Sequence, residues 1–329
     1  MAPLAFGKSV FTTAAASAAG GAEFGFVTGT HGNPNTSGHG RMTCRANAGS
    51  TKFSDSADFS IVIWFRALDG DFQAGKEFGM LMQGTTSSAP TRDIELYMNG
   101  QRDGGGDANE HSINLFCKYS GGTRTISSFR SGNDYFGSGN TDWDAKVVDG
   151  NWHCLMARFA QADSNRALYL DGDDIKRSLG SGSGGDVTGT IGLSADSYNG
   201  SSPAVDTSPS DDNGLSFNFS HFQGAFPDAG GAFDIGPVWI YDSGVDFSSS
   251  TVRDYYYNSS NTDGYVTAGS DGQTGGAAEP ELFMTTDGSS MANGGRLGTV
   301  TFHSVNGTVT QTGSSTGPGS GDTRSSANT

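Results

Sequence analysis

Two short apolar runs separated by a polar break lie near the middle of the 329-residue chain. The first run, residues 152–159, is apolar on both of its alternating faces, which is typical of a strand covered on both sides. The polar residues 161–165 predict a hairpin loop, and residues 166–170 predict the returning strand. Asp171-Gly172 then predicts a second turn, because glycine adopts a positive φ at no steric cost. This part of the chain is therefore predicted to be a β-meander.

The rest of the chain repeats this pattern of short apolar runs and polar breaks. Residues 59–68 alternate between two faces, one of which carries Phe59, Ile61, Ile63 and Phe65. Further strands are predicted at residues 78–84, 93–99, 112–119, 123–130, 215–224 and 233–242. Only residues 248–258 predict a short helix, with Ser248 or Ser249 as its N-cap. Together with 51 glycines and a hydrophobic content of 34%, the pattern favours a thin all-β sandwich over a helical bundle.

The chain divides into four predicted parts. Residues 1–22 predict an N-terminal arm, and residues 23–268 predict the sandwich domain. Residues 279–312 predict a small C-terminal β unit, in which Asn306-Gly307 is a type I′ hairpin signal. Residues 313–329 contain too few apolar side chains to bury and predict a flexible tail. The opening residues lack the apolar segment of a secretory signal, so we expect synthesis in a host cytoplasm without a signal peptide.

Three motifs resemble laminin-G-like and pentraxin-like domains of the concanavalin A-like superfamily. Residues 149–153 match the family's Asp-Gly-x-Trp-His start, and residues 169–172 match its closing Tyr-x-Asp-Gly turn. Residues 59–70 match the early aromatic-rich strand, in which a tryptophan precedes a basic residue. The resemblance covers about residues 40–260. It implies a two-sheet antiparallel jelly-roll sandwich, often a glycan-binding or adhesive module.

Residues 280–318 are similar to the segment that follows such domains in virion proteins of tailed phages. They contain a Pro-x-Leu-Phe strand, an Asn-x-Gly loop and a Thr-Val-Thr-Phe strand in that order. The resemblance implies a non-enzymatic bacteriophage structural protein on the virion surface, either a capsid decoration protein or a tail or fibre component. Its partners would be other virion proteins, bound through the N-terminal arm or the C-terminal unit. Self-association as a homo-oligomer would follow the symmetry of the particle.

Charge and hydropathy exclude two classes of partner. The net charge of −16 disfavours binding to nucleic acid phosphates or to an anionic membrane surface. No apolar run approaches the roughly 20 residues that a membrane-spanning helix needs, so we expect no membrane insertion.

A polysaccharide depolymerase is one alternative function, because many members of the superfamily hydrolyse glycans. Hydrolysis requires two carboxylates that flank the scissile bond. The laminarinase-type branch carries them as Glu-x-Asp-x-Glu; here Asp93 and Glu95 alternate, but Tyr97 occupies the third position. The six histidines are scattered without metal-ligand spacing. We therefore predict no catalytic residues and a structural role for His153.

A carbohydrate-binding host-recognition module is the other alternative, with a host surface glycan as its ligand. Residues 134–146 predict a polar loop in which Tyr135 and Trp143 would stack on sugar rings and Asn140 would bind hydroxyl groups. In the competing interpretation, Trp143 folds under the loop as a local plug. Asp142 and Asp144 are candidate oxygen ligands for Ca²⁺, or else solvated turn acids. We expect no other cofactor.

Overall fold

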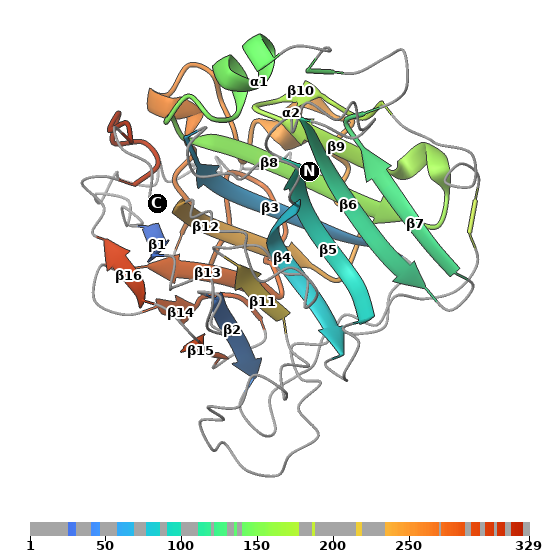
Figure 1. Ribbon diagram of the computed structural model, residues 1–329, viewed down its shortest axis with the longest axis horizontal. Helices are drawn as coiled ribbons and strands as arrows, with labels where there is room; N and C mark the ends of the chain where they lie inside the picture. The colour runs from blue at the N-terminus through green and yellow to red at the C-terminus, as the bar shows by residue number, and fades with distance from the viewer. Residues whose placement is uncertain are drawn as a thin grey trace, which may run out of the picture.

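The protein folds into two antiparallel β-sheets packed face to face, as the sequence predicts (Figure 1). The computed structural model describes residues 26–30, 41–46, 58–68, 77–85, 91–99, 111–119, 122–129, 135–136, 140–177, 186–187, 215–218, 234–269, 271–286, 291–296, 300–305, 308–312 and 317–324. The predicted arm, residues 1–22, lies outside the described residues. Among those residues, no helix combines the length and the apolar character needed to cross a membrane.

Sheet A has nine strands in the described part of the chain. In spatial order these are β10 (Asp173–Asp174), β9 (Ala167–Leu170), β8 (His153–Ala160), β3 (Asp58–Arg66), β12 (Asp234–Tyr241), β1 (Phe26–Thr30) and β16 (Thr308–Thr312), with β13 (Leu282–Thr286) paired to β12 and β14 (Met291–Asn293) paired to β13.

Sheet B has seven described strands and lies in front of sheet A in Figure 1. Their order is β15 (Val300–Val305), β2 (Arg41–Ala46), β11 (Leu215–Asn218), β4 (Glu77–Thr85), β5 (Thr91–Asn99), β6 (Ser112–Tyr119) and β7 (Gly122–Ser127). The described helices are short: α1 (Asn140–Lys146), α2 (Ser250–Arg253) and the 3₁₀ turns η2 (Asp163–Asn165) and η3 (Thr262–Gly264).

Strand β3 lies at the centre of sheet A, and its predicted alternation between two faces is confirmed; in the structure both faces are buried. One set of its side chains (Phe59, Ile61, Ile63 and Phe65) packs into the core between the sheets. The other set, which includes Val62 and Trp64, packs into a second cluster on the outer face of sheet A. Aromatic and aliphatic side chains from residues 245–277, the segment that contains α2, cover that outer face. The second cluster explains why both faces of β3 and β8 are apolar.

The predicted β-meander is confirmed. Strands β8 and β9 pair as a hairpin around η2, and β9 pairs with β10. The buried guanidinium of Arg166 fixes the hairpin loop, because its Nε donates a 2.8 Å hydrogen bond to the carbonyl of Ala160 and its Nη1 donates to Asp163. In the following turn, Asp171 and Gly172 both have positive φ values, 51° and 85°.

The predicted short helix is also confirmed as α2. Ser249 occupies its N-cap position, but its side chain makes no capping hydrogen bond. Tyr256 is buried in the second cluster, and Val252 and Tyr255 pack against that cluster, so these three side chains lie on one side.

Two predictions about the C-terminal region are wrong. Residues 279–312 do not form a separate unit, because β13 pairs with β12, β15 pairs with β2 and β16 pairs with β1. The predicted hairpin at Asn306-Gly307 is not made either, since β15 belongs to sheet B and β16 to sheet A; the two turn residues themselves lie outside the described residues. The physical reason is that strands from the beginning of the chain supply the hydrogen-bonding partners that a local hairpin would otherwise supply.

The predicted flexible tail is wrong for residues 317–324. This segment is ordered against sheet A, and Pro318 and Arg324 are buried. Polar contacts to distant residues hold it there, which its composition did not reveal.

Candidate functional site

The motif residues that carry the family resemblance converge on one ion-pair cluster, which we call the His153 cluster: Asp149, His153 and Asp171. His153 Nδ1 lies 2.7 Å from Asp171 Oδ2, and Nε2 lies 3.0 Å from Asp149 Oδ1. The His153 side chain is 7% exposed, and the two carboxylates are about a quarter exposed. The cluster therefore joins the start of β8 to the turn between β9 and β10.

Local backbone geometry positions these three side chains. Gly150 and Gly172 both have φ values of 85°, a conformation that other residues adopt only with strain. The other oxygen of Asp171 accepts a 2.7 Å hydrogen bond from the backbone N–H of Cys154, and Asp149 accepts hydrogen bonds from the backbone and side-chain amides of Asn151. Both carboxylates are thus held by protein donors before they meet the imidazole.

Electrostatics keep this histidine charged. Burial by itself lowers the pKa of His153, but the charge of Asp171 and the hydrogen bonds to Asp149 and Asp171 outweigh it and raise the pKa from 6.5 to about 9. Burial also opposes ionisation of Asp149, yet its hydrogen bond to His153 holds the pKa of that carboxyl below its ordinary value. At neutral pH both ring nitrogens carry protons and donate them to carboxylates. The ring has no free lone pair with which to act as a general base.

The predicted sugar-stacking role of Trp143 is wrong, because its side chain is completely buried. Residues 140–146 form helix α1 rather than a polar loop, and Trp143 points under it into the main core. There it stacks on His111 with ring centroids 5.4 Å apart and meets Phe136 edge-on at 4.9 Å. The plug interpretation is the correct one. The spacing of Trp143 and Val147, one helical turn apart, was the available signal for α1.

The other two predicted ligand residues lie near α1. Tyr135 is partly buried, packs edge-on against Phe136, and donates a 3.1 Å hydrogen bond to Asp173. The Nζ of Lys146 and the guanidinium of Arg177 lie 4.9 and 5.0 Å from the centre of its ring. Burial and the neighbouring Asp173 raise the pKa of Tyr135 to about 12. Asn140 begins α1, but its side chain lies outside the described residues.

The two candidate calcium ligands are exposed on α1. Positions two apart in an α-helix are separated by about 200° around the axis, so Asp142 and Asp144 cannot converge on one ion. Asp142 instead pairs with Lys146 at 3.3 Å. Within the described ranges no group of three or more His, Cys, Asp or Glu side chains is arranged to hold a metal ion.

The two carboxylates considered as a catalytic pair lie on β5. Asp93 and Glu95 alternate with Ile94 and Leu96, which are buried in the core between the sheets. The side chains of Asp93 and Glu95 themselves lie outside the described residues.

Sequence reasoning missed a second polar cluster, which connects Arg66 and Asp234 with the segment 317–324. Its members are far apart in the chain and form no local motif, so no sequence signal was available.

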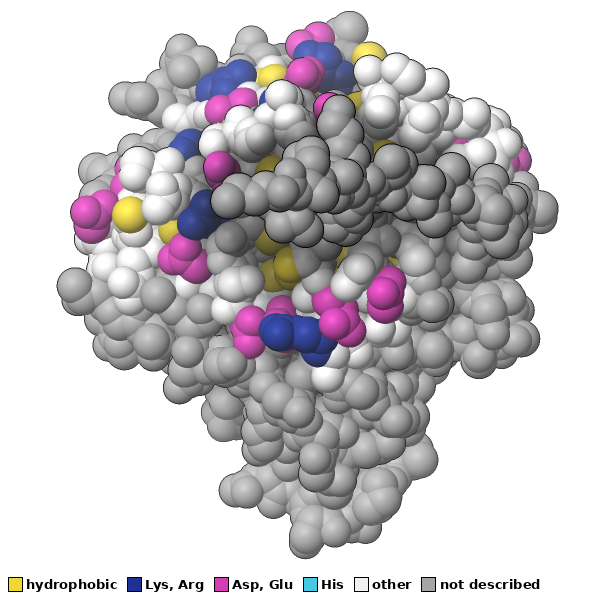
Figure 2. Space-filling model, turned by 180° about the vertical axis from the view of Figure 1, so that it is seen from behind, with side chains coloured by type: hydrophobic (Ala, Val, Ile, Leu, Met, Phe, Trp, Pro, Cys, Tyr) yellow, Lys and Arg dark blue, Asp and Glu magenta, His cyan; other side chains and the backbone are white. Residues whose placement is uncertain are grey.

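On the side opposite to Figure 1, acidic and basic side chains lie interspersed, and hydrophobic side chains show in small separate groups within the described part (Figure 2). That face therefore carries no extended apolar patch among the described residues.

The strand pairing defines a two-layer antiparallel β-sandwich, with the His153 cluster at one end of β8. No protein-family model matches the sequence, and no curated protein matches it. Similar solved structures include a protein of proposed carbohydrate-binding function from Bacteroides ovatus ATCC 8483 (9% identity, TM-score 0.44), with 88% of this chain and 60% of that chain covered.

Two further similar structures belong to the classes that the motifs resemble. One is a heptameric SAP-like pentraxin from Limulus polyphemus (9% identity, TM-score 0.44), with 88% of this chain and 96% of that chain covered. The other comprises domains LG4-5 of the mouse laminin alpha1 chain (12% identity, TM-score 0.33), with 66% of this chain and 41% of that chain covered. Pentraxin and laminin G structures are thus among those to which this chain is similar.

Proposed function

We propose that this protein is a non-enzymatic structural and adhesive component of a particle surface, namely a bacteriophage virion. The observation that carries the proposal is the state of the His153 cluster. The ionisable groups of this motif are bonded to one another. His153 pairs with two carboxylates, and Asp171 accepts hydrogen bonds from His153 and from the backbone N–H of Cys154. Because the side chains of the motif join strands to one another, they support a rigid scaffold rather than a reaction centre.

The virion role rests on the resemblance of residues 280–318 and on the predicted arm. Its test is deletion of residues 1–22 from the chain expressed in cells that produce the particle. Particles are purified on a density gradient, and the chain is quantified in them by mass spectrometry. The proposal expects the truncated chain to be folded and absent from particles while the full chain is present. Incorporation of both chains at equal levels would contradict an anchoring role of the arm, and exclusion of both would contradict the virion role.

Depolymerase activity is tested separately. The purified chain is incubated with a panel of bacterial capsular polysaccharides and algal glucans, and new reducing ends are measured. The proposal expects none above a heat-denatured control. Release of reducing ends that is abolished by Asp93→Asn or Glu95→Gln would overturn the non-enzymatic assignment.

Glycan recognition is the second candidate function, and one observation favours it. Tyr135 is partly exposed beside Lys146 and Arg177, and these two cations would suit a sugar that carries carboxylate or sulfate groups even though the chain as a whole is acidic. On a glycan array, Tyr135→Ala should lose binding to such sugars. Tyr255→Ala is the matched control, because Tyr255 is a partly buried tyrosine packed against the other cluster. Equal binding by both variants would remove this surface from consideration.

A further inference from the structure

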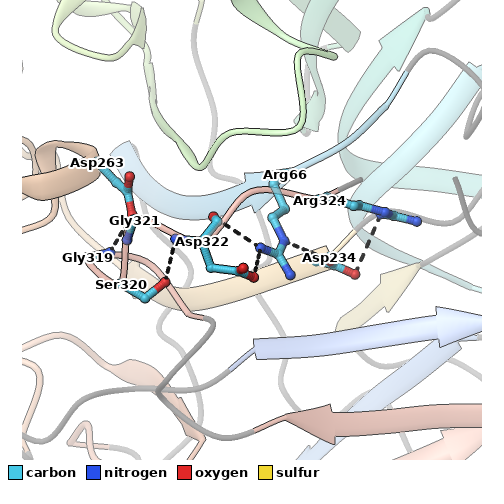
Figure 3. A network of polar contacts seen from close by, with 8 residues as sticks. All are labelled: Arg66, Asp234, Asp263, Gly319, Ser320, Gly321, Asp322 and Arg324. Carbon is cyan, nitrogen blue, oxygen red and sulfur yellow. Dashed lines mark hydrogen bonds and ion pairs between the residues drawn. The ribbon is translucent and has the colours of Figure 1, made fainter. Parts of the chain in front are cut away.

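Residues 317–324, which we call the C-terminal strap, cross sheet A near the ends of β3 and β12 (Figure 3). The strap is buried at both ends, through Gly317 and Pro318 at one end and Arg324 at the other, whereas residues 319–321 between them are exposed. None of its described residues belongs to a β-ladder. Its two ends are thus buried, and its middle is in contact with solvent.

At one end the strap completes an alternating chain of charges. The Nε of Arg66 lies 2.7 Å from Asp234, and both side chains are about 5% exposed. The strap adds one residue at each end of this buried pair: Asp322 lies 3.0 Å from Arg66 Nη1, and Arg324 lies 3.5 Å from Asp234. Figure 3 shows the four side chains in the order Asp322, Arg66, Asp234, Arg324. The strap contributes one acid and one base, so its docking leaves the charge of the buried pair balanced.

At the other end the strap covers aromatic surface. A methyl group placed on Gly236 would lie 2.9 Å from Cγ of Pro318 and 3.3 Å from the ring of Trp152, so these three residues are in close packing. One placed on Gly319 would lie 3.0 Å from the ring of Tyr265. Arg66 meanwhile stacks over Trp152, with its guanidinium 4.8 Å from the ring centre.

Backbone contacts hold the strap between its two ends. One oxygen of Asp263 accepts hydrogen bonds from the N–H groups of Gly319 and Gly321, each at 3.0 Å. Asp263 itself is held at a φ of 54° beside Tyr265. The N–H of Arg324 donates a 2.9 Å hydrogen bond to the carbonyl of Gly150, next to the His153 cluster. A few polar contacts therefore fix the strap, in contrast to the continuous ladders that fix the strands of sheet A.

We propose that the C-terminal strap is a conformational device that opens as a unit while the sandwich stays folded, and that in its closed state it covers the aromatic surface around Trp152. Opening breaks the contacts of Asp263 and Asp322, both contacts of Arg324 (with Asp234 and with Gly150) and the packing of Pro318, but it breaks no pairing between strands. Local opening of this kind costs less free energy than global unfolding, because the main core keeps its buried area.

Hydrogen exchange of the full chain, followed by mass spectrometry, tests the proposal. The wild-type strap amides should exchange at least about tenfold faster than the amides of β8, which lie at the centre of sheet A. Asp263→Ala should accelerate exchange in residues 317–324 about tenfold and leave β8 unchanged, because it removes a charged acceptor shared by two amides. Asp322→Asn, a milder change at the other end, should accelerate the same residues and no others.

The control variant is Asp246→Ala. Asp246 also accepts hydrogen bonds from a neighbouring residue, Ser248, but it lies outside the strap. It should leave exchange in residues 317–324 as in the wild type. Equal exchange rates for the strap and β8 in the wild type, with both accelerated together by Asp263→Ala, would overturn the proposal, since the strap would then open only when the sandwich unfolds.

Trypsin provides a second readout of the same opening. The carbonyl oxygen of Arg324 packs directly on Gly150, and its side chain is 6% exposed, so the closed strap cannot enter a protease active site. Cleavage after Arg324, measured by mass spectrometry as loss of residues 325–329, should be accelerated by Asp263→Ala and Asp322→Asn but not by Asp246→Ala. Cleavage at the same rate in all four proteins would contradict a strap held by these contacts.

Discussion

Replacing His153 by glutamine should remove a pH-dependent part of the stability of the sandwich. Glutamine retains hydrogen-bonding groups at the site but carries no charge. His153 is nearly fully buried between two carboxylates, and its pKa is raised from 6.5 to about 9. At about 1.4 kcal/mol per pKa unit, this shift corresponds to about 3 kcal/mol of stabilisation in the protonated state.

The direction of the pH dependence follows from the raised pKa. The folded protein binds the proton more tightly than the unfolded chain, so the stabilisation is fully present below pH 6.5 and is lost as the pH rises to about 9. The pKa of Asp149 is lowered by the same contact and is not a separate contribution.

Denaturant-unfolding curves of the wild type and of His153→Gln, recorded at pH values from about 5 to 10, measure the effect. Subtracting the two free energies of unfolding at each pH cancels the titration of all groups that the proteins share. The difference should be largest at pH 5–6 and should fall by about 3 kcal/mol as the pH passes 9. A difference that stays constant over this range would show that His153 is not held as a cation, and the reasoning about the cluster would fail.

Four further outcomes follow from the packing. Phe59→Ala should lower the free energy of unfolding by about 3–5 kcal/mol, because Phe59 is fully buried and stacked on Phe159. The control Val245→Ala, at a partly buried position, should lower it by less. Equal losses for the two variants in denaturant unfolding would contradict the packing. Trp143→Ala should cost a similar 3–5 kcal/mol by the same assay, whereas loss of glycan binding with unchanged stability would restore its surface role. Gly172→Ala should cost about 1–2 kcal/mol in thermal unfolding, because its φ of 85° disfavours a side chain; an unchanged midpoint would count against this turn. Cys117 and Cys154 are buried, and burial raises the pKa of both thiols. Iodoacetamide should therefore modify them only as fast as the protein unfolds. Rapid labelling of either residue in native buffer would contradict its burial in the core.

Local sequence patterns determined much of the fold. The two faces of β3 were readable because successive side chains of a strand point to opposite sides, whatever the strand pairs with. The turn at Asp171-Gly172 was readable for a similar reason, since a positive φ is a property of single residues. The structural role of His153 was also predicted, although its two carboxylate partners were recognised only as members of a motif.

Tertiary structure decided which strands pair and which side chains are buried. Asn306-Gly307 favours a hairpin locally, yet β15 pairs with β2 and β16 with β1, because these two strands from the beginning of the chain supply the hydrogen-bonding partners. The polar neighbours of Trp143 in the sequence favour a surface position. In the structure α1 places its side chain in the core instead.

For the C-terminal strap, the sequence and the tertiary structure give opposite answers. By composition, residues 317–324 are glycine-rich and polar and should not be ordered. Their order comes from Arg66, Asp234 and Asp263, which belong to other parts of the chain and supply the opposite charges for Asp322 and Arg324 and the acceptor for two strap amides. Periodicity and backbone preference are short-range properties that a sequence displays directly, whereas ion pairs and burial depend on residues that only the folded chain brings together.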